Sequence, residues 1–156
     1  MTTFRHVALS AVVIALAVAC PPFSYGQVVD CDTIGNCQFP DPDYGGDPSP
    51  AIFFSVDVDG MVHVNLALYI DNGCTGDPIA TGAADLPVTA GFNGFYLSWG
   101  GMPPPVGFQY SIGTTLGTCD TVCLNYTHAI DPPSCIGGAD LPKGGDLPGF
   151  EPLPSP

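Results

Sequence analysis

The sequence has almost no basic residues. Arg5 and Lys143 are its only arginine and lysine, against fifteen acidic residues. The region between them therefore has no arginine to clamp a phosphate, no lysine to form a Schiff base and no basic footprint for a nucleic acid. We expect its carboxylates to be solvated, hydrogen-bonded to the backbone or bound to cations instead of paired with lysine or arginine. The formal charge of -13 disfavours nucleic acids and anionic membranes and favours divalent cations or basic partners.

Long apolar runs are also missing, except at the N-terminus. Arg5 precedes the apolar segment Val7–Ala19, which at about thirteen residues is too short to span a bilayer and is typical of an export signal. We predict that residues 1–26 are a signal peptide cleaved before Gln27, leaving a secreted, extracellular or periplasmic protein. The alternative is an outer-surface lipoprotein anchored at Cys20, because the Ala-Val-Ala-Cys sequence there resembles a bacterial lipobox.

Six cysteines follow the predicted signal: Cys31, Cys37, Cys74, Cys119, Cys123 and Cys135. In an exported chain they imply up to three disulfides, with about fifteen possible pairings. Cys31 and Cys37 could close a short loop, and this is the first pair that we expect. A zinc site at Cys119 and Cys123 has weak support, because the spacing is CxxxC and no second close-set pair of ligands lies nearby.

The chain shows no convincing amphipathic helix after residue 26, whereas glycine (20) and proline (18) are frequent. Residues 51–58 and 61–70 alternate between apolar and polar side chains around Asp59-Gly60. They predict an antiparallel hairpin with a bulged turn and one buried face. That face contains Phe54, Val56, Val62 and Val64.

Three later segments alternate in the same way, over residues 95–99, 106–112 and 122–130, and residues 100–105 join the first two. Several short alternating strands separated by Gly and Pro predict an all-β fold. We expect one disulfide-stapled β-sandwich or jelly roll over residues 27–136. Residues 137–156 are rich in Gly, Pro and Asp and predict a disordered tail.

A family resemblance rests on patterns of strand and turn. The residues that show these patterns are Phe54-Ser55-Val56, Asp59-Gly60, Val64–Tyr69, Cys74, Phe95–Trp99 and Phe108–Ile112. With these features residues 51–112 resemble the bacterial pre-peptidase C-terminal (PPC) class of secreted jelly-roll modules. The resemblance implies a small non-catalytic sandwich, often accessory to secreted enzymes and sometimes involved in matrix or carbohydrate binding. No catalytic domain accompanies the module in this sequence, so we expect a stand-alone surface or matrix protein.

Candidate catalytic residues are few. His63 and His128 are the only histidines after the signal, and no Gly-x-Ser-x-Gly elbow is present, so a nucleophilic triad has little support. A carboxylate-based hydrolase is the enzymatic alternative, although no pair of Asp residues stands out. The two histidines could hold a transition metal, with His63 near Asp57 on the polar face of the hairpin. Solvated or core-edge histidines are the other interpretation.

Asp41, Asp43 and Asp47 form the best candidate metal site, for Ca²⁺. Asp at alternate positions around a Gly turn can supply some of the six to eight oxygen ligands that this ion takes. The loop is not an EF-hand, because Pro42 and Pro48 interrupt it, and its carboxylates could instead cap turns.

Two further loops carry weaker signals. Asp71-Asn72-Gly73 with Asp77 forms a second acidic loop. Asn125-Tyr126-Thr127 is a sequon for N-glycosylation in a source that glycosylates exported proteins.

Two functional classes follow. The first is a secreted, non-catalytic module that binds extracellular polysaccharide or protein, with Tyr96, Trp99 or Tyr110 as exposed stacking platforms. Trp99 shares its alternation with Phe95 and Leu97, which favours a core position. The second class is a structural subunit of an extracellular filament, envelope or matrix, which a long unpaired sheet edge would favour.

Overall fold

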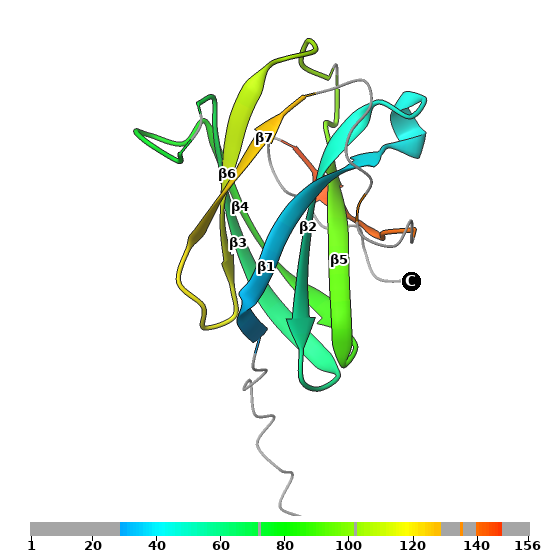
Figure 1. Cartoon of the computed structure of the whole chain (residues 1–156), viewed down its shortest axis with the longest axis vertical. Helices are drawn as coiled ribbons and strands as arrows, with labels where there is room; N and C mark the ends of the chain where they lie inside the picture. The colour runs from blue at the N-terminus through cyan, green and yellow to red at the C-terminus, as the bar shows by residue number, and fades with distance from the viewer. Residues whose placement is uncertain (1–28, 72, 102, 129–134, 136–139, 148–156) are drawn as a thin grey trace, which may run out of the picture.

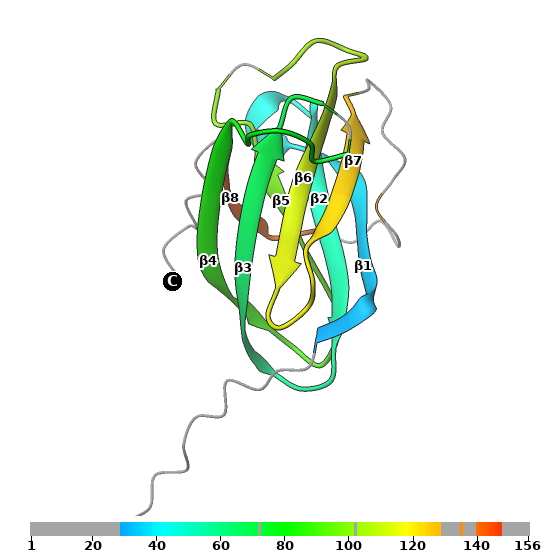
Figure 2. The same cartoon turned by 90° about the vertical axis from the view of Figure 1, so that its left-hand side faces the viewer.

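The protein folds as two stacked β-sheets of four strands each (Figures 1 and 2). The computed structural model describes residues 29–71, 73–101, 103–128, 135 and 140–147, so the predicted signal peptide and Cys20 lie outside the described residues. We call the sheet with strand order β1-β2-β5-β8 sheet A and the sheet with order β4-β3-β6-β7 sheet B. The all-β sandwich expected from the alternation is confirmed.

The elements follow one another in the order β1 (Val29–Pro40), the 3-10 turn η1 (Pro42–Tyr44), β2 (Pro48–Val56), β3 (Gly60–Tyr69), β4 (Ala80–Val88), β5 (Gly91–Ser98), β6 (Gln109–Leu116), β7 (Val122–Thr127) and β8 (Lys143–Asp146). All pairings are antiparallel except that of β5 with β8, which is parallel. No helix among the described residues is long and apolar enough to cross a membrane.

The predicted hairpin of residues 51–70 is wrong in its pairing. β2 pairs with β1 and β5, whereas β3 pairs with β4 and β6, so the chain crosses from sheet A to sheet B between them. The predicted burial is confirmed, because Phe54, Val56, Val62 and Val64 are all at most 3% exposed. Alternation identifies the buried face of a strand, but it does not say whether the matching face lies beside it or across the core.

The core fills the space between the sheets. Phe54 packs edge-on against Phe95, and Tyr110 stacks on Tyr126, whose hydroxyl donates to the carbonyl of Ala51 at 3.0 Å. β6 starts later than the alternation of residues 106–112 predicted. Gly107 has a φ of 83° and belongs to a turn, so the strand begins only at Gln109.

Three disulfides join strands and loops that are distant in the sequence: Cys31–Cys119, Cys37–Cys135 and Cys74–Cys123. The expected Cys31–Cys37 pair is therefore wrong. Both residues lie on β1, and the strand extends between them instead of turning back to bring their sulfurs together. Proximity in sequence favours a short loop only where the chain can bend.

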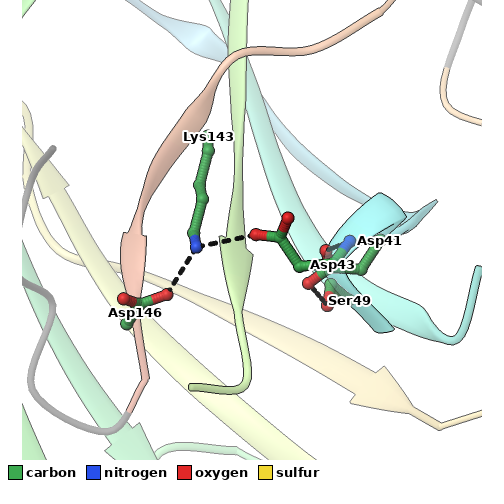
Figure 3. A network of polar contacts seen from close by, with 5 residues as sticks. All are labelled: Asp41, Asp43, Ser49, Lys143 and Asp146. Atoms are coloured by element: carbon green, nitrogen blue, oxygen red, sulfur yellow. Dashed lines mark hydrogen bonds and ion pairs between the residues drawn. The ribbon is translucent and has the colours of Figure 1, made fainter. Parts of the chain in front are cut away.

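Part of the predicted disordered tail is ordered. β8 pairs with β5, and Leu147 after it is 5% exposed in the core. Lys143 also links this segment to the acidic loop, because its ammonium contacts Asp43 at 3.0 Å and Asp146 at 2.9 Å (Figure 3). The expectation that the folded region has no lysine ion pairs is corrected by the same contacts. Residues 137–139 and 148–156 lie outside the described residues.

Candidate functional site

Two of the three predicted stacking platforms are buried. Tyr96 is 5% exposed and stacks on Phe39, and Tyr110 is 1% exposed in the core. Trp99 is half-buried, and its indole nitrogen donates to the carbonyl of Pro48 at 3.3 Å. The expectation that Tyr96 and Tyr110 present their rings to a ligand is therefore corrected, because alternation shows which aromatics share a face but not which face is covered.

The acidic loop forms a hydrogen-bonded turn around Asp41. The carboxylate of Asp41 is fully buried, caps η1 by accepting from the backbone nitrogen of Asp43 at 2.9 Å and accepts from the hydroxyl of Ser49 at 2.9 Å (Figure 3). Asp43 turns outward to Lys143, whose pKa is raised by its hydrogen bonds to Asp146 and Asp43.

A lysine far away in the sequence thus contributes a cation to this loop, a feature that sequence spacing did not reveal. Across the described residues no group of three or more His, Cys, Asp and Glu side chains is placed to hold a metal ion. Calcium binding by Asp41, Asp43 and Asp47 stays a prediction. In the second acidic loop, Asp71 accepts from the hydroxyl of Thr75 at 2.7 Å, and Asp77 is exposed.

The two histidines occupy different environments. His63 is exposed on the outer face of sheet B, and its Nδ1 lies 2.8 Å from a carboxylate oxygen of Asp85, where Asp57 had been expected as its neighbour. His128 is buried at the end of β7, with its ring centroid 6.4 Å from that of Trp99. Because His63 faces solvent and His128 faces the interior, the fold offers no shared surface for the predicted metal pair.

The sequon residue Asn125 is exposed on β7. Its side-chain oxygen accepts from the backbone nitrogen of Gly73 at 2.8 Å, and Tyr126 between Asn125 and Thr127 is buried.

Sequence reasoning missed an open hollow on the outer face of sheet B, which we call the outer groove. It has a volume of about 510 Å³, within the range of small-molecule sites, and none of its ten lining residues is charged. Its floor consists mainly of small residues from the paired strands β3, β4 and β6: Ala67, Gly82, Ala83 and Gly113. Its polar lining consists of Asn65, Tyr69, Thr81, Thr115 and Thr121.

Strand register explains this arrangement. Asn65 lies between Ala83 and Thr115, and Ala67 lies between Thr81 and Gly113, so these outward side chains form two adjacent rows across sheet B. The aromatic ring of Tyr69 lies beside Gly113, since a Cβ at Gly113 would lie 3.4 Å from that ring, at ordinary van der Waals contact.

The outer groove is bordered by hydrogen bonds, a disulfide and an ion pair. At one end, the hydroxyl of Ser111 donates to the carbonyl of Asp71 at 2.6 Å and accepts from the nitrogen of Cys74 at 3.0 Å. The Cys74–Cys123 disulfide ties the same loop to β7. At the other end, the His63–Asp85 pair occupies the row next to Asn65 and Ala83. The groove therefore lies on paired strands, next to a loop that a disulfide fixes.

A scan against protein-family models finds no matching family, and searches of curated proteins and of solved structures find no matching protein. The resemblance to PPC modules stays a prediction.

Proposed function

We propose that the protein is a secreted, non-catalytic binding module that holds a neutral extracellular polysaccharide in the outer groove. The observation that carries the proposal is the lining of the groove: amide and hydroxyl groups beside an aromatic ring, with no charged residue, on a chain of formal charge -13. Sugar hydroxyls need hydrogen-bond partners of this kind, and a ring such as that of Tyr69 can pack against the apolar face of a sugar.

Electrostatics narrows the class of ligand. The acidic surface repels polyanions, so acidic polysaccharides and nucleic acids are disfavoured at this face. A neutral polymer experiences no such repulsion. Its affinity should therefore depend little on ionic strength, in contrast to a charged ligand.

The groove is also held in shape before any ligand arrives. Thr115 and Thr121 contact each other through their hydroxyls at 2.7 Å, and Gly113 and Ala67 lie in registered strands. A site whose side chains are already ordered loses less conformational entropy on binding. The open shape fits an extended polymer that enters and leaves along the sheet.

The three disulfides indicate an oxidising extracellular or periplasmic environment. Secretion through the predicted signal of residues 1–26 is part of the proposal. The proposed alternative is a structural subunit of an extracellular assembly, and the edge strand β4, which pairs only with β3 among the described residues, supports it.

The first prediction concerns Tyr69. Tyr69→Ala should weaken binding to a neutral polysaccharide about tenfold, because it removes the only ring of the groove lining. The measurement is affinity electrophoresis through gels containing a panel of neutral and acidic polysaccharides, followed by calorimetry with the best ligand at two salt concentrations.

Phe92→Ala is the matched control, since Phe92 is 52% exposed on sheet A and stacks on Phe53 outside the groove. It should bind as the unaltered chain does. Loss of binding in Phe92→Ala with retention in Tyr69→Ala would move the site to sheet A. Absence of binding to every neutral polysaccharide would refute the proposal.

A further inference from the structure

The two sheets have four lateral edges, and the described residues protect three of them unequally well. The edges of β1 and β7 are joined, because Asn36 and Gln38 donate from their side chains to the carbonyls of Asn125 and Thr127, each at 2.6 Å. β8 covers β5 and is itself only four residues long, with a charged residue at each end. β4 is nine residues long and pairs within the described part of the chain only with β3 (Figure 2, left side of sheet B).

Pro87 shows which backbone groups of β4 face outward. It lies opposite Met61 and has no N–H, so this pair is a non-hydrogen-bonded one. Hydrogen-bonded pairs alternate with such pairs, so Leu86, Ala84 and Gly82 bond to β3. The outward-facing N–H and C=O groups belong to Thr81, Ala83 and Asp85.

We propose that the edge of β4 binds a second copy of this chain, antiparallel and centred on Ala83. In that register Ala83 lies opposite Ala83 of the partner subunit, and Thr81 lies opposite Asp85 of the partner subunit. Each outward N–H then meets an outward C=O. No carboxylate lies opposite another carboxylate, and each threonine hydroxyl can donate to the facing carboxylate. The edge is therefore complementary to itself, and the partner that fits it is a second copy of this chain.

Dimerisation through β4 is a property separate from the proposed polysaccharide binding and does not depend on it. It joins the two copies of sheet B into one continuous surface and brings their outer grooves together at β4, since Thr81 and Ala83 line both the groove and the edge. The charge of -13 on each copy opposes association. Added salt screens this repulsion and should strengthen the dimer.

The test is sedimentation equilibrium of the mature chain with intact disulfides, across the micromolar range at low and high sodium chloride. A monomer–dimer equilibrium that strengthens with salt is expected. Ala83→Pro should abolish the dimer and leave the melting temperature of the dilute monomer unchanged, because the N–H that it removes faces away from β3. Ala84→Pro should instead lower the melting temperature, because its N–H bonds to β3.

Charge placement tests the register. Thr81→Asp should weaken the dimer about tenfold by placing two symmetry-related pairs of like charge opposite each other, and Thr81→Lys should strengthen it. Thr127→Asp and Thr127→Lys make the same changes in net charge at an exposed side chain of β7, whose edge is joined to β1, and should have much smaller effects. A chain that is monomeric at every salt concentration overturns the proposal. Dimerisation that persists in Ala83→Pro, or that responds equally at Thr81 and Thr127, also overturns it.

Discussion

At the scale of single residues, His128 connects stability to pH. Its ring is 4% exposed beside Trp99, and this burial lowers its pKa below the usual 6.5, while the charge of Asp47 acts in the opposite direction. The unfolded chain therefore takes up a proton at a higher pH than the folded chain does. The stability that the uncharged His128 contributes is fully present above pH 6.5, and it is lost as the pH falls toward the pKa of the folded state.

His128→Gln should remove this dependence. Between pH 7 and 5 the free energy of unfolding of the unaltered chain should fall more steeply than that of the variant, because only the former contains this buried histidine. Urea unfolding at several pH values measures both slopes. Both chains contain the same carboxylates, so the effect of these groups on stability cancels in the difference between the two slopes. Parallel plots of unfolding free energy against pH would contradict the role given to His128.

Phe54 tests the packing of the core. It is 1% exposed and contacts Phe95 in the core, so Phe54→Ala should lower the free energy of unfolding by about 3–5 kcal/mol. Phe92→Ala removes the same side chain from a position that is 52% exposed and should cost much less. Equal losses in denaturant titrations of the two variants would be inconsistent with the described core.

At the scale of elements, β8 depends on contacts from a distant loop. Lys143 of β8 reaches Asp43 in η1, one hundred residues away, while Leu147 enters the core. The sequence identified the acidic loop but not this partner. A single lysine between glycine and proline carries no periodic signal, and its role arises only after the chain has folded.

Lys143→Met should lower stability by about 1 kcal/mol or less, because the ion pairs are partly exposed, and should speed hydrogen exchange in β8. It should also strengthen any binding of Ca²⁺ to the loop, since the ammonium no longer competes for Asp43. Melting in millimolar Ca²⁺ against chelator tests this, with Lys143→Arg as the charge-conserving control. Identical curves in both buffers, for both variants and for Asp43→Asn, would exclude calcium stabilisation.

At the scale of the whole molecule, three covalent links hold segments that are 88, 98 and 49 residues apart. Alkylation without reductant should leave the mass of the mature protein unchanged. Removing Cys31–Cys119 by a double Cys→Ser substitution should cost about 4 kcal/mol, because it frees a long loop in the unfolded chain. Removing Cys74–Cys123 should cost somewhat less. Denaturant titrations compare the two, and free thiols in the native protein would contradict the pairing.

Sequence patterning predicted the fold class and the buried face of β2 and β3, because alternation of side chains is a local property. It failed where the answer depends on three-dimensional arrangement. The partners of β2 and β3, the disulfide pairs and the burial of Tyr96 and Tyr110 all follow from which sheet each strand joins. The outer groove could not be predicted, since its small residues carry no chemical signature and are brought together only by strand register.

The wide spacing of the disulfides determines how the protein must mature. The chain emerges N-terminus first, so Cys31 and Cys37 meet an oxidant long before Cys119 and Cys135 are available. A bond between these early cysteines would be non-native and would have to be exchanged later. Cys37 can form its native disulfide with Cys135 only after almost the whole described chain has emerged. We therefore expect yield in an oxidising host to depend on a disulfide isomerase more than on the strength of the oxidant.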